Sequence, residues 1–181
     1  MNTSPERVTI LQGEARASAD PAITMTTILG SCVATCLYDP VAQVGGMNHF
    51  LLAEPAARTR DQGFDSDYGL FLMELLINEM LKLGAVKSRM KARLYGGANM
   101  NPDLTPIGSG NAAFARSFLA AEGIEKTFED LEGNLARRVE FRPASGLVRA
   151  RAVMVDPASL PAATHKSRSA AQSGFGAVEL F

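Results

Sequence analysis

The sequence predicts an α+β protein, a sandwich of mixed β-sheets with helices on the outside. Roughly eight segments of the 181-residue chain have the composition and alternation of strands, and only two have helical periodicity. The strands do not alternate regularly with helices, which argues against a parallel βαβ architecture. A single domain of this length buries enough surface to fold without a metal ion or a disulfide.

The first part of the chain, from residue 7 to residue 52, is predicted to be strands separated by turn residues. The expected strands are 8–11, 14–18, 23–29, 32–39 and 46–52, and the turns contain Gly13, Asp20-Pro21, Gly30 and Asp39-Pro40.

Helical periodicity begins after a polar segment, 53–64, that we interpret as a loop. A helix is expected over 65–84, and its apolar residues at intervals of three and four predict one broad buried face. These residues are Tyr68, Phe71, Leu72, Leu75, Leu76, Met80 and Leu83. The remaining expected elements are a strand at 90–98, a helix at 109–122 and strands at 125–131, 136–142 and 147–155.

The composition also indicates where the domain ends. Residues 1–155 are predicted to form one domain, and the Ala-, Ser- and Pro-rich residues 156–181 a flexible C-terminal tail that closes on the apolar cluster Val178–Phe181.

Charge and hydropathy exclude several classes of function. The net charge is −1 and the pI is about 6.1, which argues against a nucleic-acid binder. The apolar runs are too short for membrane insertion, and the N-terminus lacks the pattern of a secretory signal. We therefore expect a cytoplasmic protein.

Two cysteines, Cys32 and Cys36, lie four positions apart in a segment with strand character. On a strand they are ~13 Å apart, too far for a disulfide, so we expect two reduced thiols. One nearby histidine leaves a zinc site without a fourth ligand, and we predict neither a metal nor another cofactor.

The spacing of Cys32 and His49 indicates a possible nucleophile and base. If the chain turns about the Pro40–Val41 bond, paired residues have numbers that sum to 81, so Cys32 lies opposite His49. Directly opposed residues have Cβ atoms ~4.5–5.5 Å apart, and a shift by one residue would place His49 on the wrong face.

A nucleophilic thiol needs a neighbouring base, because its ordinary pKa of about 8.5 leaves little thiolate at neutral pH. His49 is the candidate base, since the other histidine, His165, is in the tail. A hydroxyl at position 24, 26 or 27, all threonines, could orient the imidazole, and the backbone amides of residues 30–32 could bind an oxyanion.

Structural explanations exist for the same residues. A lone strand cysteine is commonly a small buried apolar residue, and a lone histidine commonly a hydrogen-bonded structural one. For Cys36 the structural explanation is the one we adopt.

A longer stretch around these residues resembles the signature segment of the CheD family, the chemoreceptor glutamine deamidases of bacterial chemotaxis. The segment is ILGSCVATCLYDPVAQVGGMNHFLL, residues 28–52. The resemblance continues through the helix at 66–84, YGGANM (95–100), IGSGNAAFARSFLAAEGI (107–124) and EGNLARRVEF (132–141), and covers about residues 7–155.

The resemblance implies a cysteine amidohydrolase that converts receptor glutamines to glutamates through a thioester, without a cofactor, and that also hydrolyses glutamyl methyl esters. By position it implies Cys32 as nucleophile, His49 as general base and acid, and Thr26 as third member. Gly30 and Ser31 remain our own candidates for backbone support of the oxyanion. It further implies a fold similar to that of the bacterial toxin deamidases.

The resemblance also concerns partners and specificity. Receptor cytoplasmic helices are the implied substrate, and a receptor-adaptation phosphatase is a possible inhibitory partner. Segments 53–64 and 97–106 are candidate rims of the site, and Glu132 stands where the family commonly has glycine.

The alternatives are a non-catalytic module that binds receptors or the phosphatase, and a redox-sensing thiol protein, for which a resolving cysteine is missing.

Overall fold

A computed structural model of the chain describes residues 6–52 and 66–154. The strands are β1 (Glu6–Thr9), β2 (Glu14–Ser18), β3 (Ile23–Leu29), β4 (Val33–Asp39), β5 (Val44–His49), β6 (Lys91–Gly96), β7 (Glu125–Leu131), β8 (Ala136–Arg142) and β9 (Leu147–Val153). The helices are α1 (Ser66–Lys82), the short 3₁₀ helix η1 (Lys87–Arg89) and α2 (Ile107–Ala121). The expected loop 53–64, the tail 156–181 and the domain end at residue 155 lie outside the described residues.

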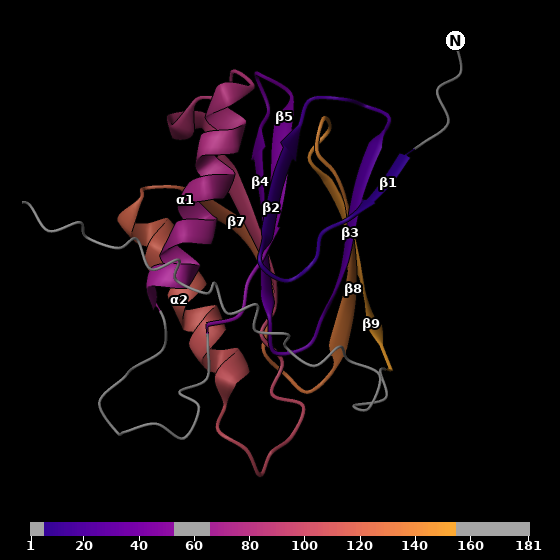
Figure 1. Cartoon of the computed structure of the whole chain (residues 1–181), viewed down its shortest axis with the longest axis vertical. Coiled ribbons are helices and arrows are strands. Elements are labelled where there is room, and N and C mark those ends of the chain that lie inside the picture. Colours follow the sequence, from indigo (N-terminus) through magenta and orange to yellow (C-terminus); the bar gives the residue numbers. More distant parts are fainter. Residues whose placement is uncertain (1–5, 53–65, 155–181) are drawn as a thin grey trace, which may run out of the picture.

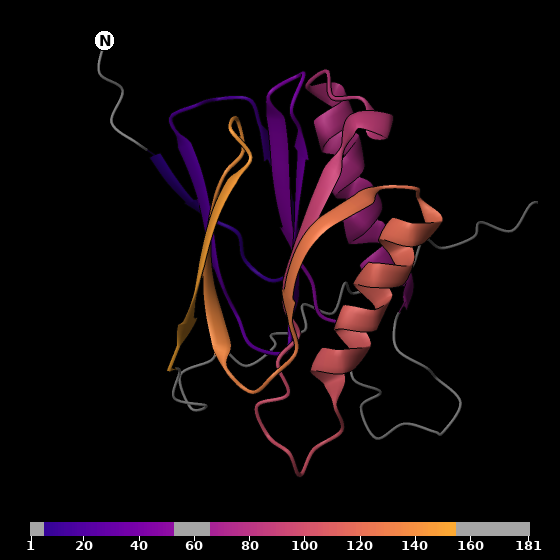
Figure 2. The ribbon, with the colours of Figure 1, turned by 180° about the vertical axis from the view of Figure 1, so that it is seen from behind.

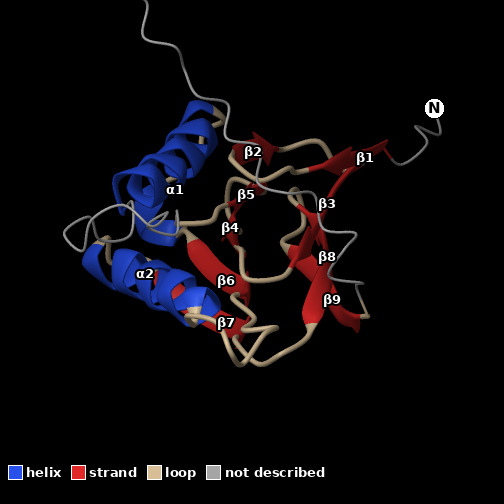
Figure 3. Ribbon diagram, turned by 60° about the horizontal axis from the view of Figure 1, so that its bottom comes forward, coloured by secondary structure: helices blue, strands red, loops and turns tan. Residues whose placement is uncertain are grey.

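The strands form two mixed sheets, which confirms the predicted α+β class. One sheet has the order β1-β3-β8-β9 and the other the order β2-β5-β4-β6-β7. Pairs β1–β3 and β6–β7 are parallel and the remaining pairs antiparallel. Helices α1 and α2 cover the outer face of the five-stranded sheet, and the four-stranded sheet faces its other side (Figures 1 and 3). Figure 2 shows the three layers from behind, with the β8–β9 hairpin on the side away from the helices.

Strand β4 is buried on both faces because it lies between the two apolar cores. Val33 and Leu37 belong to the core under the helices, whereas Ala34 and Cys36 belong to the core between the sheets. Successive strand side chains point to opposite faces, so this alternation places position 32 on the side that faces the second sheet. Neither helix in the described ranges is long and apolar enough to cross a membrane.

The buried face of α1 is narrower than predicted. Leu72, Leu76 and Met80 are buried as expected, but Phe71 is 56% exposed. At ~100° per residue, Phe71 lies about 140° around the helix from Leu76, beyond the stripe that one sheet can cover.

The β4–β5 hairpin differs in register from the prediction. Asp39 pairs with Val44, so paired numbers sum to 83 rather than 81, and Cys32 is not directly opposite His49. A four-residue turn separates the strands, in which Gln43 has a positive φ of 53°. Because the shift is two residues, every side chain keeps its predicted face.

The Asp39 side chain explains why this turn forms. Its carboxylate accepts hydrogen bonds from the amides of Val41 (2.9 Å) and Ala42 (3.1 Å) and pairs with the Arg89 guanidinium at 2.8 Å. Burial alone would raise the pKa of this carboxyl, but the bonds from Arg89 and from the amides, that of Val86 included, hold the pKa well below its usual range.

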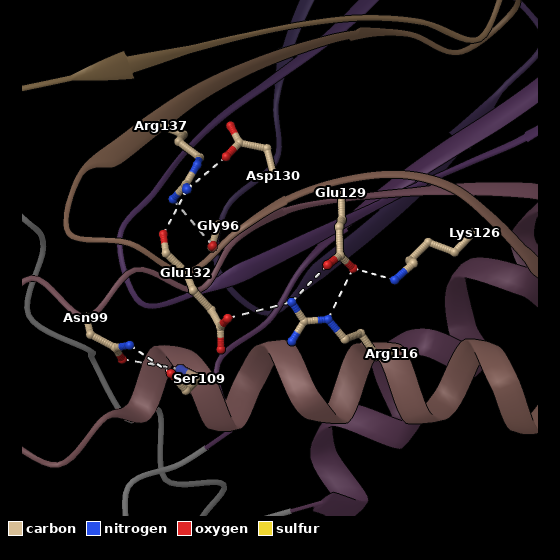
Figure 4. A network of polar contacts seen from close by, with 9 residues as sticks. All are labelled: Gly96, Asn99, Ser109, Arg116, Lys126, Glu129, Asp130, Glu132 and Arg137. Atoms are coloured by element: carbon tan, nitrogen blue, oxygen red, sulfur yellow. Dashed lines mark hydrogen bonds and ion pairs between the residues drawn. The ribbon is translucent and has the colours of Figure 1, made fainter.

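A second polar network fixes the turn between β7 and β8 (Figure 4). Glu132 adopts a φ of 67°, a conformation that favours glycine. Its amide donates to Gly96 O at 2.9 Å and its carbonyl accepts from Arg137 Nη2 at 2.8 Å. Its carboxylate lies 3.7 Å from Arg116 on α2, so the turn is tied to both β6 and the helix.

The start of α2 is held by the segment that follows β6. Asn99 Oδ1 accepts from the Ser109 amide at 3.2 Å, and Asn99 Nδ2 donates to Ser109 Oγ at 2.8 Å (Figure 4). The bond from the Ser109 amide to Asn99 satisfies one of the free amides of the first helical turn. The residue before the helix, Pro106, provides no side-chain cap. Part of the predicted rim at 97–106 is thus anchored to the helix.

We predict that Gly96→Ala destabilises the fold far more than Gly84→Ala. Both glycines have a positive φ, 105° and 92°, but only at Gly96 would a Cβ lie 2.2 Å from the Cys32 carbonyl oxygen. We expect Gly84→Ala to cost about 1 kcal/mol and Gly96→Ala at least about 3 kcal/mol of unfolding free energy, measured by urea denaturation. Equal losses would contradict the close packing of β6 on the Cys32 segment.

Candidate active site

The segment that carries Cys32 links β3 to β4 and is fixed by its carbonyl groups. The carbonyls of residues 30–32 accept, in order, from the Ala98 amide (2.9 Å), Asn111 Nδ2 (2.8 Å) and the Gly97 amide (2.8 Å). These donors come from α2 and from the turn after β6. The Cys32 thiol is half-buried at the edge of the inter-sheet core.

Asn111 connects the two halves of the site, and the sequence reasoning did not identify it. Its side chain is fully buried on α2, and its Oδ1 accepts from the Leu52 amide at 2.9 Å. One carboxamide therefore joins Ser31, next to the thiol, to a residue three positions after His49. A buried asparagine among the apolar residues of 111–119 was the available signal, but a single sequence does not reveal its partners.

His49 is the last residue of β5 and its imidazole faces the four-stranded sheet. Nδ1 lies 2.9 Å from Thr27 Oγ1 and 3.3 Å from the Ile10 carbonyl oxygen, and the Thr27 hydroxyl itself donates to Ile10 O at 2.8 Å. Since the hydroxyl proton is used and the carbonyl only accepts, we assign the imidazole proton to Nδ1.

The opposite nitrogen of His49, Nε2, is buried and has no hydrogen-bond partner among the described residues. With Nδ1 protonated, Nε2 carries a free lone pair and can accept a proton. The bridge between Val33 and Phe50 makes Cys32 and His49 diagonal neighbours on one face, ~7–8 Å apart at Cα. The structure thus brings nucleophile and base candidates to one face without a direct hydrogen bond between them.

The threonine in contact with His49 is Thr27, whereas the resemblance implies Thr26 as the third member. On β3, Met25, Thr27 and Leu29 are buried and face the other sheet. Thr26 is the adjacent residue on the strand and points to the opposite face, where its Oγ1 has no hydrogen-bond partner within the described ranges. Of the three threonines considered, the contact selects Thr27.

The turn between β1 and β2, residues 10–13, contacts all three residues of the site. The Ile10 carbonyl binds Thr27 and His49, the Gly13 amide donates to His49 O at 2.8 Å, and Cys32 Sγ donates to Gln12 Oε1 at 3.6 Å. Sequence reasoning interpreted Gly13 only as a strand break and missed this role, because the contacts join elements far apart in the chain.

Burial keeps both reactive groups neutral in this state. It raises the pKa of the Cys32 thiol to about 12, against a smaller lowering by the cysteine's own amide. Burial also lowers the pKa of His49, although the bond to Ile10 and the charge of Glu14 act in the opposite direction. The resting pair is therefore a thiol and a neutral imidazole rather than a thiolate and an imidazolium.

Cys36 is a free, buried thiol in the inter-sheet core, and burial raises its pKa above the usual range. In the described part of the chain, no three His, Cys, Asp or Glu residues lie close enough together to hold a metal ion.

Comparisons with known proteins identify relatives of the chain. The chain is 51% identical over 148 residues to a protein of Zymomonas mobilis named "Probable chemoreceptor glutamine deamidase CheD", covering 82% of this chain and 81% of that protein. A protein of the same name from Caulobacter sp. strain K31 is 47% identical over 175 residues, covering 97% of this chain and 93% of the relative.

A comparison with solved structures gives only a weak likeness, whereas a comparison with family models gives a match over more than half of the chain. A Neisseria meningitidis protein of solved structure, NMB0706, has 13% identity and a TM-score of 0.43 over 67% of this chain and 54% of its own, too low to support a fold assignment. The model of the family described as "CheD chemotactic sensory transduction" matches residues 51–152, more than half of the chain. With the two relatives of about 50% identity, this match shows that the chain belongs to the CheD family.

Proposed function

We propose that this protein deamidates glutamine side chains of chemoreceptors to glutamate, with Cys32 as nucleophile and His49 as general base and acid. The observation that carries the proposal is the position of the His49 imidazole on the same face as the Cys32 thiol. Thr27 and Ile10 hold this ring at Nδ1, and Nε2 has no hydrogen-bond partner among the described residues. The relatives' names supply the substrate class.

In the first half-reaction, the Cys32 thiol gives its proton to His49 Nε2 while Sγ bonds to the glutamine Cδ. The carbonyl oxygen takes up negative charge. When the C–N bond breaks, the imidazolium returns the proton to nitrogen, so ammonia leaves and a thioester remains. Neutral partners are a suitable starting point, because the proton moves only as substrate arrives.

In the second half-reaction, water attacks the thioester carbon while Nε2 removes its proton. The proton then passes to the Cys32 sulfur as the C–S bond breaks, and glutamate is released. A glutamyl methyl ester would follow the same steps with methanol as the leaving group, so we propose methylesterase activity at the same site.

The oxyanion needs donors, and we propose the amides of the segment that contains Gly30 and Ser31. The carbonyls of residues 30–32 are each bound to other groups, which fixes the peptide planes and the direction of their N–H groups. Thr27 acts as a positioning residue, since it touches His49 and not the reacting atoms.

The proposal extends to the cellular location of the protein, its partners and the similarity of its fold to other deamidases. We propose that the protein works in the cytoplasm on receptor helices and that a receptor-adaptation phosphatase could bind over the site. A fold similar to that of the bacterial toxin deamidases also stays a prediction.

The nucleophile is tested by comparing Cys32→Ala with Cys36→Ala. Receptor cytoplasmic domains incubated with each variant are analysed by mass spectrometry for the gain of about 1 Da that accompanies conversion of glutamine to glutamate. We expect no conversion by Cys32→Ala and most of the wild-type rate with Cys36→Ala. Conversion by folded Cys32→Ala would contradict the assignment, and no conversion even by wild type would favour the binding module.

The positioning role is tested by two substitutions of the same size on neighbouring residues. Thr27→Val removes the hydroxyl beside His49 and should lower kcat about 10- to 100-fold, as misorientation of a base does. Thr26→Val removes a hydroxyl that has no hydrogen-bond partner, and kcat should change less than twofold. A larger loss with Thr26→Val would restore Thr26 as the third member, and Thr27→Ser should recover most of the activity.

The pH dependence follows from the lowered pKa of His49. The base must be neutral, and burial lowers its pKa below the ordinary value of 6.5, so protonation begins only at more acidic pH. We expect kcat/KM to stay near its plateau at pH 6.5 and to fall about tenfold per pH unit below the lowered pKa. A midpoint above pH 7 would instead indicate an imidazolium in the resting enzyme.

A further inference from the structure

Gln12 is the exposed residue in contact with the Cys32 thiol. The thiol donates to Gln12 Oε1 at 3.6 Å, and the remaining surroundings of Cys32 include the inter-sheet core. Cys32 is half-buried whereas Gln12 is exposed, so the Gln12 side chain lies on the solvent side of the sulfur. A substrate that approaches from solvent meets this side chain first.

The chemistry of Gln12 matches that of the proposed substrate. Its side chain ends in the carboxamide that the enzyme is proposed to hydrolyse. The Gln12 carboxamide lies in an unreactive orientation, because the Cys32 S–H group points at its carbonyl oxygen. Nucleophilic attack would require the sulfur atom to reach the carbonyl carbon.

The backbone beneath Gln12 is held firmly, which limits the motion to its side chain. The Ile10 amide donates to Thr26 O at 2.9 Å, and the Gly13 amide is bound to His49 O. Gly13 has a φ of 86°, and a Cβ there would lie 2.4 Å from the Tyr68 hydroxyl. Rotation of the exposed Gln12 side chain needs no backbone change and occurs within picoseconds to nanoseconds.

We propose that Gln12 is a specificity-determining gate: its carboxamide occupies the entrance to Cys32 and is displaced by the incoming substrate carboxamide. This inference rests on the proposed function for the identity of the substrate. The incoming carbonyl oxygen first accepts the thiol hydrogen bond that Gln12 gives up, so the exchange costs little. The thiol hydrogen then turns to His49 Nε2 as the substrate carbon comes within reach of the sulfur. A group that cannot accept this bond gains nothing from displacing Gln12, which disfavours other electrophiles.

The first test measures the thiol without any receptor. The full-length protein is treated with 2-bromoethylamine, an alkylating reagent without a carbonyl group, and alkylation of Cys32 is followed by mass spectrometry, with buried Cys36 as an internal control for unfolding. We expect Gln12→Ala to raise the Cys32 rate about 3- to 10-fold, the effect of one modest hydrogen bond. Equal rates for wild type and Gln12→Ala would overturn the gate, whatever substrate the enzyme uses.

Two matched variants separate the gate from a general change in the turn. Leu11→Ala alters the neighbouring exposed side chain, which takes no part in the contacts described above, and its rate should stay within twofold of wild type. Gln12→Glu keeps the length and an acceptor oxygen, while its charge opposes thiolate formation, so its rate should not exceed that of wild type. Acceleration by Leu11→Ala equal to that by Gln12→Ala would overturn the proposal.

A second test uses the receptor substrate and separates binding from chemistry. Removing a competing side chain should lower KM in Gln12→Ala and leave kcat within about twofold, whereas a residue that stabilises the transition state would lower kcat. A lower kcat with unchanged KM would therefore contradict a gate. So would conversion of Gln12 itself to glutamate in wild type but not in Cys32→Ala, because Gln12 would then be a substrate.

Discussion

The candidate active site depends on one hydrogen-bonded contact between the two sheets. Thr27 on β3 of the four-stranded sheet meets His49 on β5 of the five-stranded sheet, and the Ile10 carbonyl binds both. This contact fixes the tautomer of His49 and directs its free nitrogen toward the face that carries Cys32. If the sheets packed differently, the same residues would remain in the chain but would not form a base. Under the proposed function, the packing of the two sheets against each other would position the catalytic base.

The same packing is compatible with the proposal that Cys32, a thiol of raised pKa, serves as nucleophile. Burial disfavours both the thiolate and the imidazolium, so the resting pair stores no separated charge. Charge develops only after substrate provides a carbonyl oxygen to carry it and amides stabilise that oxygen. A neutral thiol is also protected from unwanted electrophiles, and Gln12 adds to this protection by its position on the solvent side.

The sequence alone predicted much of this arrangement but not its contacts. Alternating strand patterns gave the sheet class and the correct faces for Cys32 and His49, even though the Asp39 turn shifted the hairpin by two residues. The sequence did not predict that Thr27 rather than Thr26 contacts His49, because adjacent residues on a strand point to opposite faces and only the structure shows which face meets the histidine. Asn111 and Gln12 were missed because their partners are distant in sequence.

The central claim is that the resting site pairs a neutral thiol with an imidazole protonated at Nδ1. Nitrogen-15 NMR of the imidazoles across a pH titration tests this directly, with a His165→Asn variant to assign the two histidines. The structure predicts an Nδ1-protonated tautomer for His49 and a pKa below 6.5. A proton on Nε2 at neutral pH, or an imidazolium that persists above pH 7, would contradict it.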